Sequence, residues 1–193
     1  MSFAVQPFVQ AQVTPDSTLG SEQSRVVPSP TDGSFGQQIE GGAIRGSNLF
    51  HSFRDFNVLE GETIYFVNPA DVRTIVSRVT GERPSNIDGV LGVSGGSADL
   101  FDLNPNGILF GNNARLDVKG SFIATTANAI QFGTQGVFSS STPSSPPFLT
   151  VSPSAFLFSS DAVSAISNRS TAPLSSGMTG LEVLNGESLL LLG

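Results

Sequence analysis

Residues 100–111 read LFDLNPNGILFG, and this stretch decides the fold expected of the chain. Apolar residues alternate with other types up to Leu103 and resume at Ile108, which predicts a strand on each side. The NPNG tetrapeptide between them, residues 104–107, holds the residue types of a β-turn. Pro105 fixes φ at about −65°, as the second turn position requires, while Asn and Gly tolerate positive φ. The stretch therefore predicts a rigid corner between two short strands.

Short β segments of this kind, bounded by Gly, Asn and Asp, recur along the chain. Their expected positions are Thr63–Val67, Val90–Val93, Asp99–Leu103, Ile108–Phe110, Ala114–Val118, Ser121–Thr125, Ile130–Phe132, Phe148–Val151, Ala155–Phe158 and Ser188–Leu192. Two all-β architectures fit: a sandwich or up-and-down barrel, or a solenoid of very short strands. The shortness of the strands, and the echo of LDV (116–118) in LEV (181–183), favour the solenoid, although no strict period can be counted.

One segment predicts a helix. Asn68 precedes Pro69, an arrangement typical of a helix start. Val72, Ile75, Val76 and Val79 then recur at helical spacing. We expect one short helix near residues 69–79, ended by Gly81.

Composition excludes several functions. The chain has 193 residues, a net charge of −7, nine Lys and Arg, and no Cys. An acidic chain lacks the basic stripe that phosphate contacts require, so no nucleic-acid partner is expected. Without Cys there are no disulfides, thiol nucleophiles or Cys-metal sites. No apolar run approaches the roughly 18 residues of a membrane-spanning helix.

The residues that could carry chemistry are sparse. His51 is the one histidine and lies between phenylalanines, which indicates a structural histidine hydrogen-bonded near the surface. Asp88, Asp99, Asp102 and Asp117 are isolated and form no D-x-D pair, so they are expected in turns or facing solvent. We therefore expect no catalytic residues, cofactor or metal. The alternative functions are an adhesive or carbohydrate-binding β-helix module and a polysaccharide-active enzyme.

Several motifs resemble those of one family. The stretch GSNLFHSFRDFNV (46–58), followed by SRVTG (77–81), PSNIDG (84–89), ADLF (98–101) and NPNG, is similar to the two-partner secretion (TPS) domain of filamentous-haemagglutinin-like exoproteins, also called the haemagglutination activity domain. The style is most similar to cyanobacterial members. Onto this chain the motifs place Asn48, Phe50, His51, Phe53, Phe56, Asn57, Asn86, Asp88, Gly89, Asn104, Pro105, Asn106, Gly107 and Ile108 as structural or secretion residues.

The resemblance implies a right-handed parallel β-helix with an N-terminal capping sheet, supplied by residues 13–45, and with extra-helical elements. It implies a secretion module without catalysis, small-molecule substrate or cofactor. The partner is then a TpsB-type transporter of the Omp85 superfamily, whose POTRA domains bind the module in the periplasm. The exoprotein crosses the outer membrane without ATP and folds outside, where it is secreted or stays at the cell surface. We expect a monomer.

The resemblance also sets the expected domain boundaries. Residues 13–193 correspond to the secretion domain, as the N-terminal fragment of a longer exoprotein, and residues 1–12 to a signal-peptide remnant or a disordered N-terminus. Residues 139–147, SSSTPSSPP, predict a surface excursion between coils. In one respect the chain departs from the family: where haemagglutinin-type members carry NPNL, it has Asn68-Pro69-Ala70-Asp71.

Overall fold

The computed structural model describes residues 13–29, 36–159, 164–174 and 177–193. The expectation for residues 1–12 falls outside these residues. The described chain is all-β, with strands β1 to β18 and one 3-10 turn, η1 (Gly20–Glu22). No helix among the described residues has the length and apolar character needed to cross a membrane.

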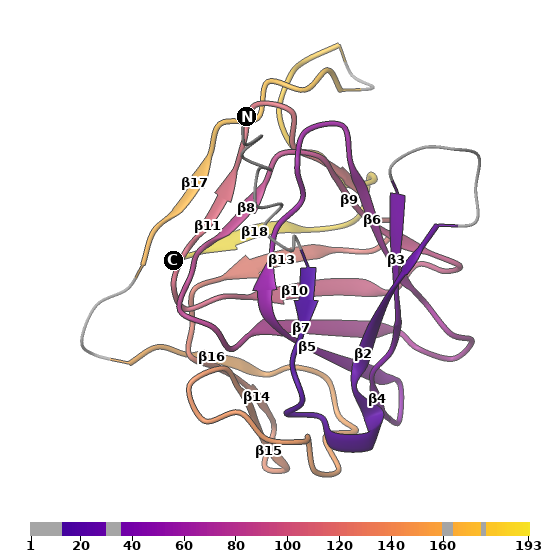
Figure 1. Cartoon of the computed structure of the whole chain (residues 1–193), viewed down its shortest axis with the longest axis vertical. Coiled ribbons are helices and arrows are strands. Elements are labelled where there is room, and N and C mark those ends of the chain that lie inside the picture. Colours follow the sequence, from indigo (N-terminus) through magenta and orange to yellow (C-terminus); the bar gives the residue numbers. More distant parts are fainter. Residues whose placement is uncertain (1–12, 30–35, 160–163, 175–176) are drawn as a thin grey trace, which may run out of the picture.

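The strands coil into a parallel β-helix with three faces, which confirms the predicted solenoid. The largest face, sheet A, stacks the parallel strands β5, β7, β10, β13 and β18 (Figure 1). Sheet B stacks β3, β6, β9 and β12, and sheet C stacks β8, β11 and β17. The bounds are β3 Gly36–Gly41, β5 Asn48–Phe56, β6 Thr63–Val67, β7 Thr74–Val79, β8 Ser85–Ile87, β9 Val90–Ser94, β10 Asp99–Leu103, β11 Ile108–Phe110, β12 Arg115–Asp117, β13 Phe122–Thr125, β17 Ile166–Asn168 and β18 Leu189–Leu192.

Each coil visits sheets B, A and C in turn, and equivalent positions recur about 25 residues apart. Parallel register places like side chains above one another. Leu49 pairs with Ile75, Ile75 with Leu100, and Leu100 with Phe122. These four side chains are fully buried and belong to the continuous apolar core inside the solenoid. Because each coil needs only its neighbours, such a core grows coil by coil.

Antiparallel strands cover the N-terminal end of the solenoid, as the expected capping sheet would. β1 (Val13–Pro15) and β4 (Ala43–Arg45) both pair with β5, and β2 (Ser24–Pro28) pairs with β3. β1 and β2 are edge strands, and each contains a proline. Proline on an edge strand removes a donor and discourages pairing with another chain.

An extra-helical sheet lies between β13 and β17. It consists of β14 (Ala129–Phe132), β15 (Gly136–Ser139) and β16 (Ala155–Leu157), all antiparallel. Its apolar side packs on the outer face of sheet A, where Phe50, Val76 and Leu103 are buried with Phe132 and Phe138. The surface excursion predicted at residues 139–147 is confirmed for residues 141–145, which are exposed in the loop after β15, whereas Ser139 belongs to β15 and is buried together with Ser140 and Pro146. The strand expected at residues 148–151 is instead part of this loop, although Leu149 is buried.

The helix expected near residues 69–79 is wrong. Residues 70–71 form a turn, with Asp71 at a φ of 71°, and Thr74–Val79 is strand β7. β7 lies between β5 and β10, with the solenoid core on one face and the extra-helical sheet on the other. All six of its residues are buried. Strands buried on both faces are apolar without alternation, so the helical spacing of the valines and Ile75 was coincidental.

Candidate functional site

The NPNG motif is a closed turn between β10 and β11, as the sequence predicts. The Gly107 amide donates to the Asn104 carbonyl at 3.1 Å, and the Asn106 amide donates to Asn104 Oδ1 at 3.0 Å. Gly107 has a φ of 112°, which favours glycine. Pro105 is half-buried, and Ile108 enters the solenoid core. A local structural requirement therefore explains the residue type at each position of the motif.

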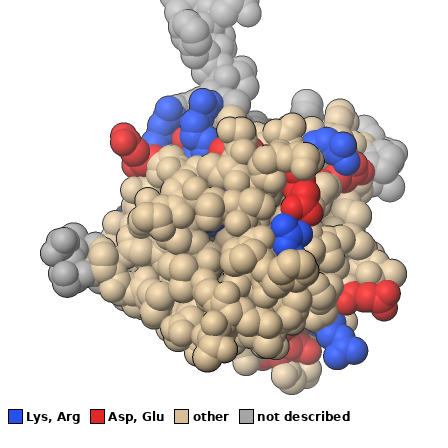
Figure 2. Space-filling model, turned by 90° about the horizontal axis from the view of Figure 1, so that it is seen from below, with Lys and Arg blue, Asp and Glu red and all other residues tan. Residues whose placement is uncertain are grey.

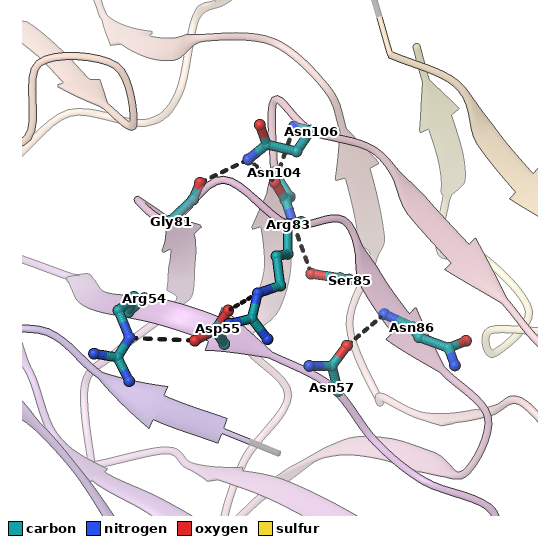
Figure 3. Close-up of polar contacts among 9 residues, drawn as sticks. All are labelled: Arg54, Asp55, Asn57, Gly81, Arg83, Ser85, Asn86, Asn104 and Asn106. Atoms are coloured by element: carbon teal, nitrogen blue, oxygen red, sulfur yellow. Dashed lines mark hydrogen bonds and ion pairs between the residues drawn. The ribbon is translucent and has the colours of Figure 1, made fainter. Parts of the chain in front are cut away.

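The corner is also bonded to the coil before it (Figure 3). Asn104 is fully buried, and its Nδ2 donates to the Arg83 carbonyl at 3.0 Å and to Ser85 Oγ at 2.9 Å. Nδ2 of Asn106 donates to the Gly81 carbonyl at 2.7 Å. These side-chain bonds tie the turn after β10 to the segment between β7 and β8, in the gap between the β7–β10 and β8–β11 pairings. The corner therefore links adjacent coils by hydrogen bonds as well as turning the chain.

A second group of motif residues lines the neighbouring turns. Asn57 Oδ1 accepts from the Asn86 amide at 2.9 Å, and Asp88 Oδ1 accepts from the Asn113 amide at 2.9 Å. A Cβ on Gly89 would lie 2.4 Å from the carbonyl oxygens of both Leu59 and Glu62. The coils approach closely here, and only glycine fits.

The remaining motif residues lie on β5 and face both sides of sheet A. On the inner face, His51, Phe53 and Phe56 cluster with Phe66, with ring centroids 5.2 to 6.3 Å apart. His51 is fully buried, so the expectation of a histidine near the surface is wrong. Burial lowers the pKa of His51 to about 3. It is a neutral core residue.

The outer face of β5 holds the extra-helical sheet in place. The Phe50 ring packs on Phe138 and Phe132 with centroids 4.8 and 5.4 Å away. Asn48 is buried, and its Nδ2 donates to the carbonyls of Leu149 and Val151 at 2.7 and 2.8 Å. Asn48 therefore fixes the loop between β15 and β16 to β5.

Arg78, on the outer face of β7, is a functional candidate that the sequence reasoning missed. It is 1% exposed, and its guanidinium donates to Ser52 Oγ, Thr18 Oγ1 and the carbonyls of Ser139 and Ser144, at 2.7 to 2.9 Å. Its partners come from the cap, the first coil and the excursion, so we call this arrangement the Arg78 clamp. Burial lowers the pKa of Arg78 to about 10, which leaves it charged at neutral pH. Its only sequence signal was membership of the SRVTG match.

Asp16, in the cap, completes the clamp. Its carboxylate accepts from the Thr18 amide and hydroxyl and from the hydroxyls of Ser52 and Thr80, at 2.6 to 2.8 Å. Burial by itself raises the pKa of Asp16, but these hydrogen bonds outweigh it and hold the pKa below its ordinary value. The clamp is thus a charged network that joins three separate parts of the chain.

Charge is distributed unevenly over the surface. Arg54 and Arg83 both approach the Asp55 carboxylate, at 3.2 and 3.7 Å, beside the corner (Figure 3). In contrast, residues 121–160 contain no Lys, Arg, Asp or Glu, and we call them the uncharged segment. The face of the molecule seen in Figure 2 is mostly uncharged, with most charged side chains toward its rim. Five apolar side chains of the uncharged segment are 39–82% exposed: Val137, Phe148, Val151, Leu157 and Phe158.

Among the described residues, His, Asp and Glu form no cluster of three or more that could hold a metal ion. Asp88, Asp99 and Asp117 are at least partly exposed, as expected for isolated acids. Asp102 differs, because it is 1% exposed inside the solenoid. Sequence spacing gave no indication of that burial.

The chain matches one family model and is similar to one solved structure. A family model described as TPS secretion domain matches residues 11–193. Among solved structures, the crystal structure of a filamentous hemagglutinin secretion domain aligns with a TM-score of 0.49 and 24% identity, covering 61% of this chain and 43% of that one. The chain thus spans less than half the length of the chain in that structure. No curated protein matches it.

Proposed function

Because the chain belongs to the TPS secretion domain family, we propose that it is recognised by the POTRA domains of a cognate TpsB-type outer-membrane transporter. The family is a secretion module of two-partner exoproteins, so secretion and a transporter partner follow from membership. The observation that carries the proposal is the family match over residues 11–193. Residues 13–193 then form the secretion domain, at the N-terminus of an exoprotein.

We propose that the exoprotein crosses the periplasm and the outer membrane unfolded, without ATP, and that the domain folds outside as a monomer. Two features support this route. Cysteine is absent, so no disulfide obstructs threading, and the coils stack on their neighbours, so folding can proceed as the chain emerges. The motif residues act through the shape that they give the solenoid. From the motif resemblance we also propose a cyanobacterial source and an adhesive full-length protein.

Co-expression tests the function. The domain, fused to a signal peptide, is produced in a Gram-negative host with the cognate transporter, with the transporter lacking its POTRA domains, or without it. We expect the domain in the medium only beside the intact transporter. Equal amounts in the medium in all three strains would overturn the proposal. A periplasmic marker protein measured in the same samples controls for leakage.

We place the transporter contact on the uncharged segment. Its exposed Phe148 and Phe158, 82% and 44% exposed, are available to a partner without a change in fold. β16 is an edge strand of this region, and unlike β1 and β2 it contains no proline, so an extended POTRA segment can add to it by β-augmentation. The Pro-containing edges of the cap are less suited to this role.

Binding of the purified domain to isolated POTRA domains tests the contact. Phe148→Ser and Phe158→Ser should leave the unfolding midpoint unchanged and weaken binding at least tenfold together. Leu184→Ser is the matched control, because Leu184 is 57% exposed at the C-terminal end of the described chain, outside the uncharged segment. Unchanged binding by the double variant would remove the contact from this segment and leave the secretion function standing.

A further inference from the structure

A column of polar side chains crosses the apolar interior of the solenoid. In the register of sheet A, His51 pairs with Ser77, and Ser77 pairs with Asp102. All three lie on the inner face, two residues along from the buried Leu49, Ile75 and Leu100. Their exposed fractions are 0%, 0% and 1%. Adjacent strands are about 4.8 Å apart, so the Ser77 hydroxyl lies between the imidazole and the carboxyl group.

The column is short of hydrogen-bond partners. Within the described residues, four of its buried polar atoms have no hydrogen-bond partner at ordinary geometry: His51 Nε2, Ser77 Oγ and both carboxyl oxygens of Asp102. Only the far end of the column is bonded, where His51 Nδ1 lies 3.0 Å from Ser24 Oγ. Buried polar groups normally pair with one another, so the unpaired atoms of these three adjacent residues are candidates to satisfy each other.

Among the described residues, no charged side chain acts on the pKa of His51 or Asp102. The neighbours of the column include Ser24 from β2, Phe66 from β6 and Ala124 from β13, none of which is charged. Burial lowers the pKa of His51, and burial raises that of Asp102 against the opposing effect of the Ser77 hydroxyl. An unpaired buried charge is very costly. Both groups are therefore most stable in their neutral forms inside the fold.

We propose that folding moves a proton from His51 to Asp102. In the unfolded chain at mildly acidic pH, His51 is an imidazolium and Asp102 a carboxylate. In the folded domain, the carboxylic acid of Asp102 donates to Ser77 Oγ, the Ser77 hydroxyl donates to His51 Nε2, and His51 Nδ1–H donates to Ser24 Oγ. One proton leaves one site and one binds the other, so the pair exchanges no net proton with solvent.

The pKa values define the pH range. The pKa of His51 falls from 6.5 to about 3 on folding, and that of Asp102 rises from 3.8 to about 7. Between about pH 4 and 6.5, His51 contributes stability that grows with pH, because the unfolded chain binds its proton. Asp102 contributes stability that declines with pH, because the folded chain binds its proton. The two slopes cancel, so the pair makes folding insensitive to pH over this range.

Replacing either residue should reveal the pH dependence of stability that the other one contributes. Asp102→Asn keeps a hydrogen-bonding group at the site and leaves His51 as the titrating member of the pair. Relative to wild type, its folding equilibrium constant should rise about tenfold per pH unit from pH 4 to 6.5. His51→Gln leaves Asp102 as the titrating member, and its folding equilibrium constant should fall by about the same factor per pH unit. Asp71→Asn, at an exposed turn residue, is the control and should run parallel to wild type.

The experiment is equilibrium unfolding in urea of these four proteins at pH 4.5, 5.5 and 6.5, joined to proton counting during refolding at pH 5.5 with an indicator dye. Compared with wild type, Asp102→Asn should release about one additional proton and His51→Gln should take up about one. Slopes of the same sign, or parallel to wild type in both variants, would overturn the proposal.

A measurement on the wild type keeps the test decisive if a variant fails to fold. The folded domain has one histidine, so its Hε1 resonance is assigned without ambiguity. Between pH 4 and 7 this resonance should not titrate, while the side-chain carboxyl carbon of Asp102 should titrate near pH 7. A folded-state His51 that titrates near 6.5, or an Asp102 that titrates near 4, would contradict the transfer. The proposal is independent of the transporter.

Discussion

The guanidinium carbon of Arg78 lies 4.0 Å from the centroid of the Phe138 ring. Arg78 belongs to β7 in the solenoid, and Phe138 belongs to β15 in the extra-helical sheet. The contact is a buried cation–π pair, and such pairs are strongest when desolvated. Together with the hydrogen bonds to Thr18 and Ser144, it makes Arg78 the point where cap, solenoid and excursion meet.

Replacement of Arg78 by Met should therefore destabilise the domain by about 3 kcal/mol, because the hydroxyls of Thr18 and Ser52 and two backbone carbonyls lose a buried charged donor. Arg78→Lys keeps the charge but lacks the planar fork that reaches four acceptors, so it should recover less than half of the loss. Urea unfolding measures both values. A lysine variant as stable as wild type would show that charge alone, without geometry, holds the clamp.

Asn104→Ala should cost about 2 to 3 kcal/mol, since the Arg83 carbonyl and the Asn106 amide lose their partner. Asn104→Asp separates the two roles of the side chain. It retains the acceptor for Asn106 but loses the Nδ2 donor to the neighbouring coil, so it should also be destabilised. Thermal unfolding of the two variants gives the comparison.

Asn112→Ala is the control for the corner, because Asn112 is an exposed asparagine in the turn that follows β11. It should change stability by less than about 0.5 kcal/mol. If Asn104→Ala were equally mild, the corner would be a turn without a fastening role. In secreted protein, the Asn104 variants should also accumulate less in the medium, in proportion to their loss of stability.

Asn48→Ala should release the excursion without unfolding the solenoid. The two carbonyls that Asn48 holds, those of Leu149 and Val151, belong to the loop between β15 and β16. Limited proteolysis should then cut within residues 140–151 several times faster than in wild type, while the solenoid core stays intact. Uniform degradation of the whole chain at the same rate increase would instead mean that Asn48 stabilises the fold globally.

Strands whose ends are set by local turn residues were predictable from the sequence, whereas elements buried by distant residues were not. The strands Thr63–Val67, Asp99–Leu103 and Ile108–Phe110 have the bounds expected from sequence, because turn residues delimit them locally. The sequence of β7 predicts a helix instead of a strand, because its outer face is buried by residues some 50 positions away. The extra-helical sheet that covers it has no periodic signal in the sequence. Local pattern cannot register such distant burial.

The polar residues show the same division. The Asn104–Gly107 corner was predictable, since each side chain has a local role in the turn. Arg78 and Asp102 were not, because their environments depend on the register of sheet A. A lone arginine and a lone aspartate in sequence normally lie at the surface. Only the stacking of coils shows that one is clamped under the excursion and the other enclosed in the core.

The clamp carboxylate of Asp16 should make stability depend on pH with a definite sign. The folded-state pKa of Asp16 lies below its unfolded value of 3.8. Its stabilising contribution is therefore present above about pH 4 and is lost as pH falls through the folded-state pKa. Asp16→Asn removes the ionisable group while keeping its shape. It should cost about 2 kcal/mol at pH 6, since four hydrogen bonds to a carboxylate are lost or weakened.

The difference in stability between wild type and Asp16→Asn should shrink as pH falls from 4 to 2.5, because wild type then loses the charge that the variant never had. Urea unfolding at pH 6, 4, 3 and 2.5 measures this difference, in which the contributions of His51 and all other shared groups cancel. Asp71→Asn should show no such convergence, since Asp71 is exposed outside the clamp. A constant gap between wild type and Asp16→Asn across the whole range would mean that hydrogen bonding to Asp16 does not require its charge, and that the clamp is held by Arg78 alone.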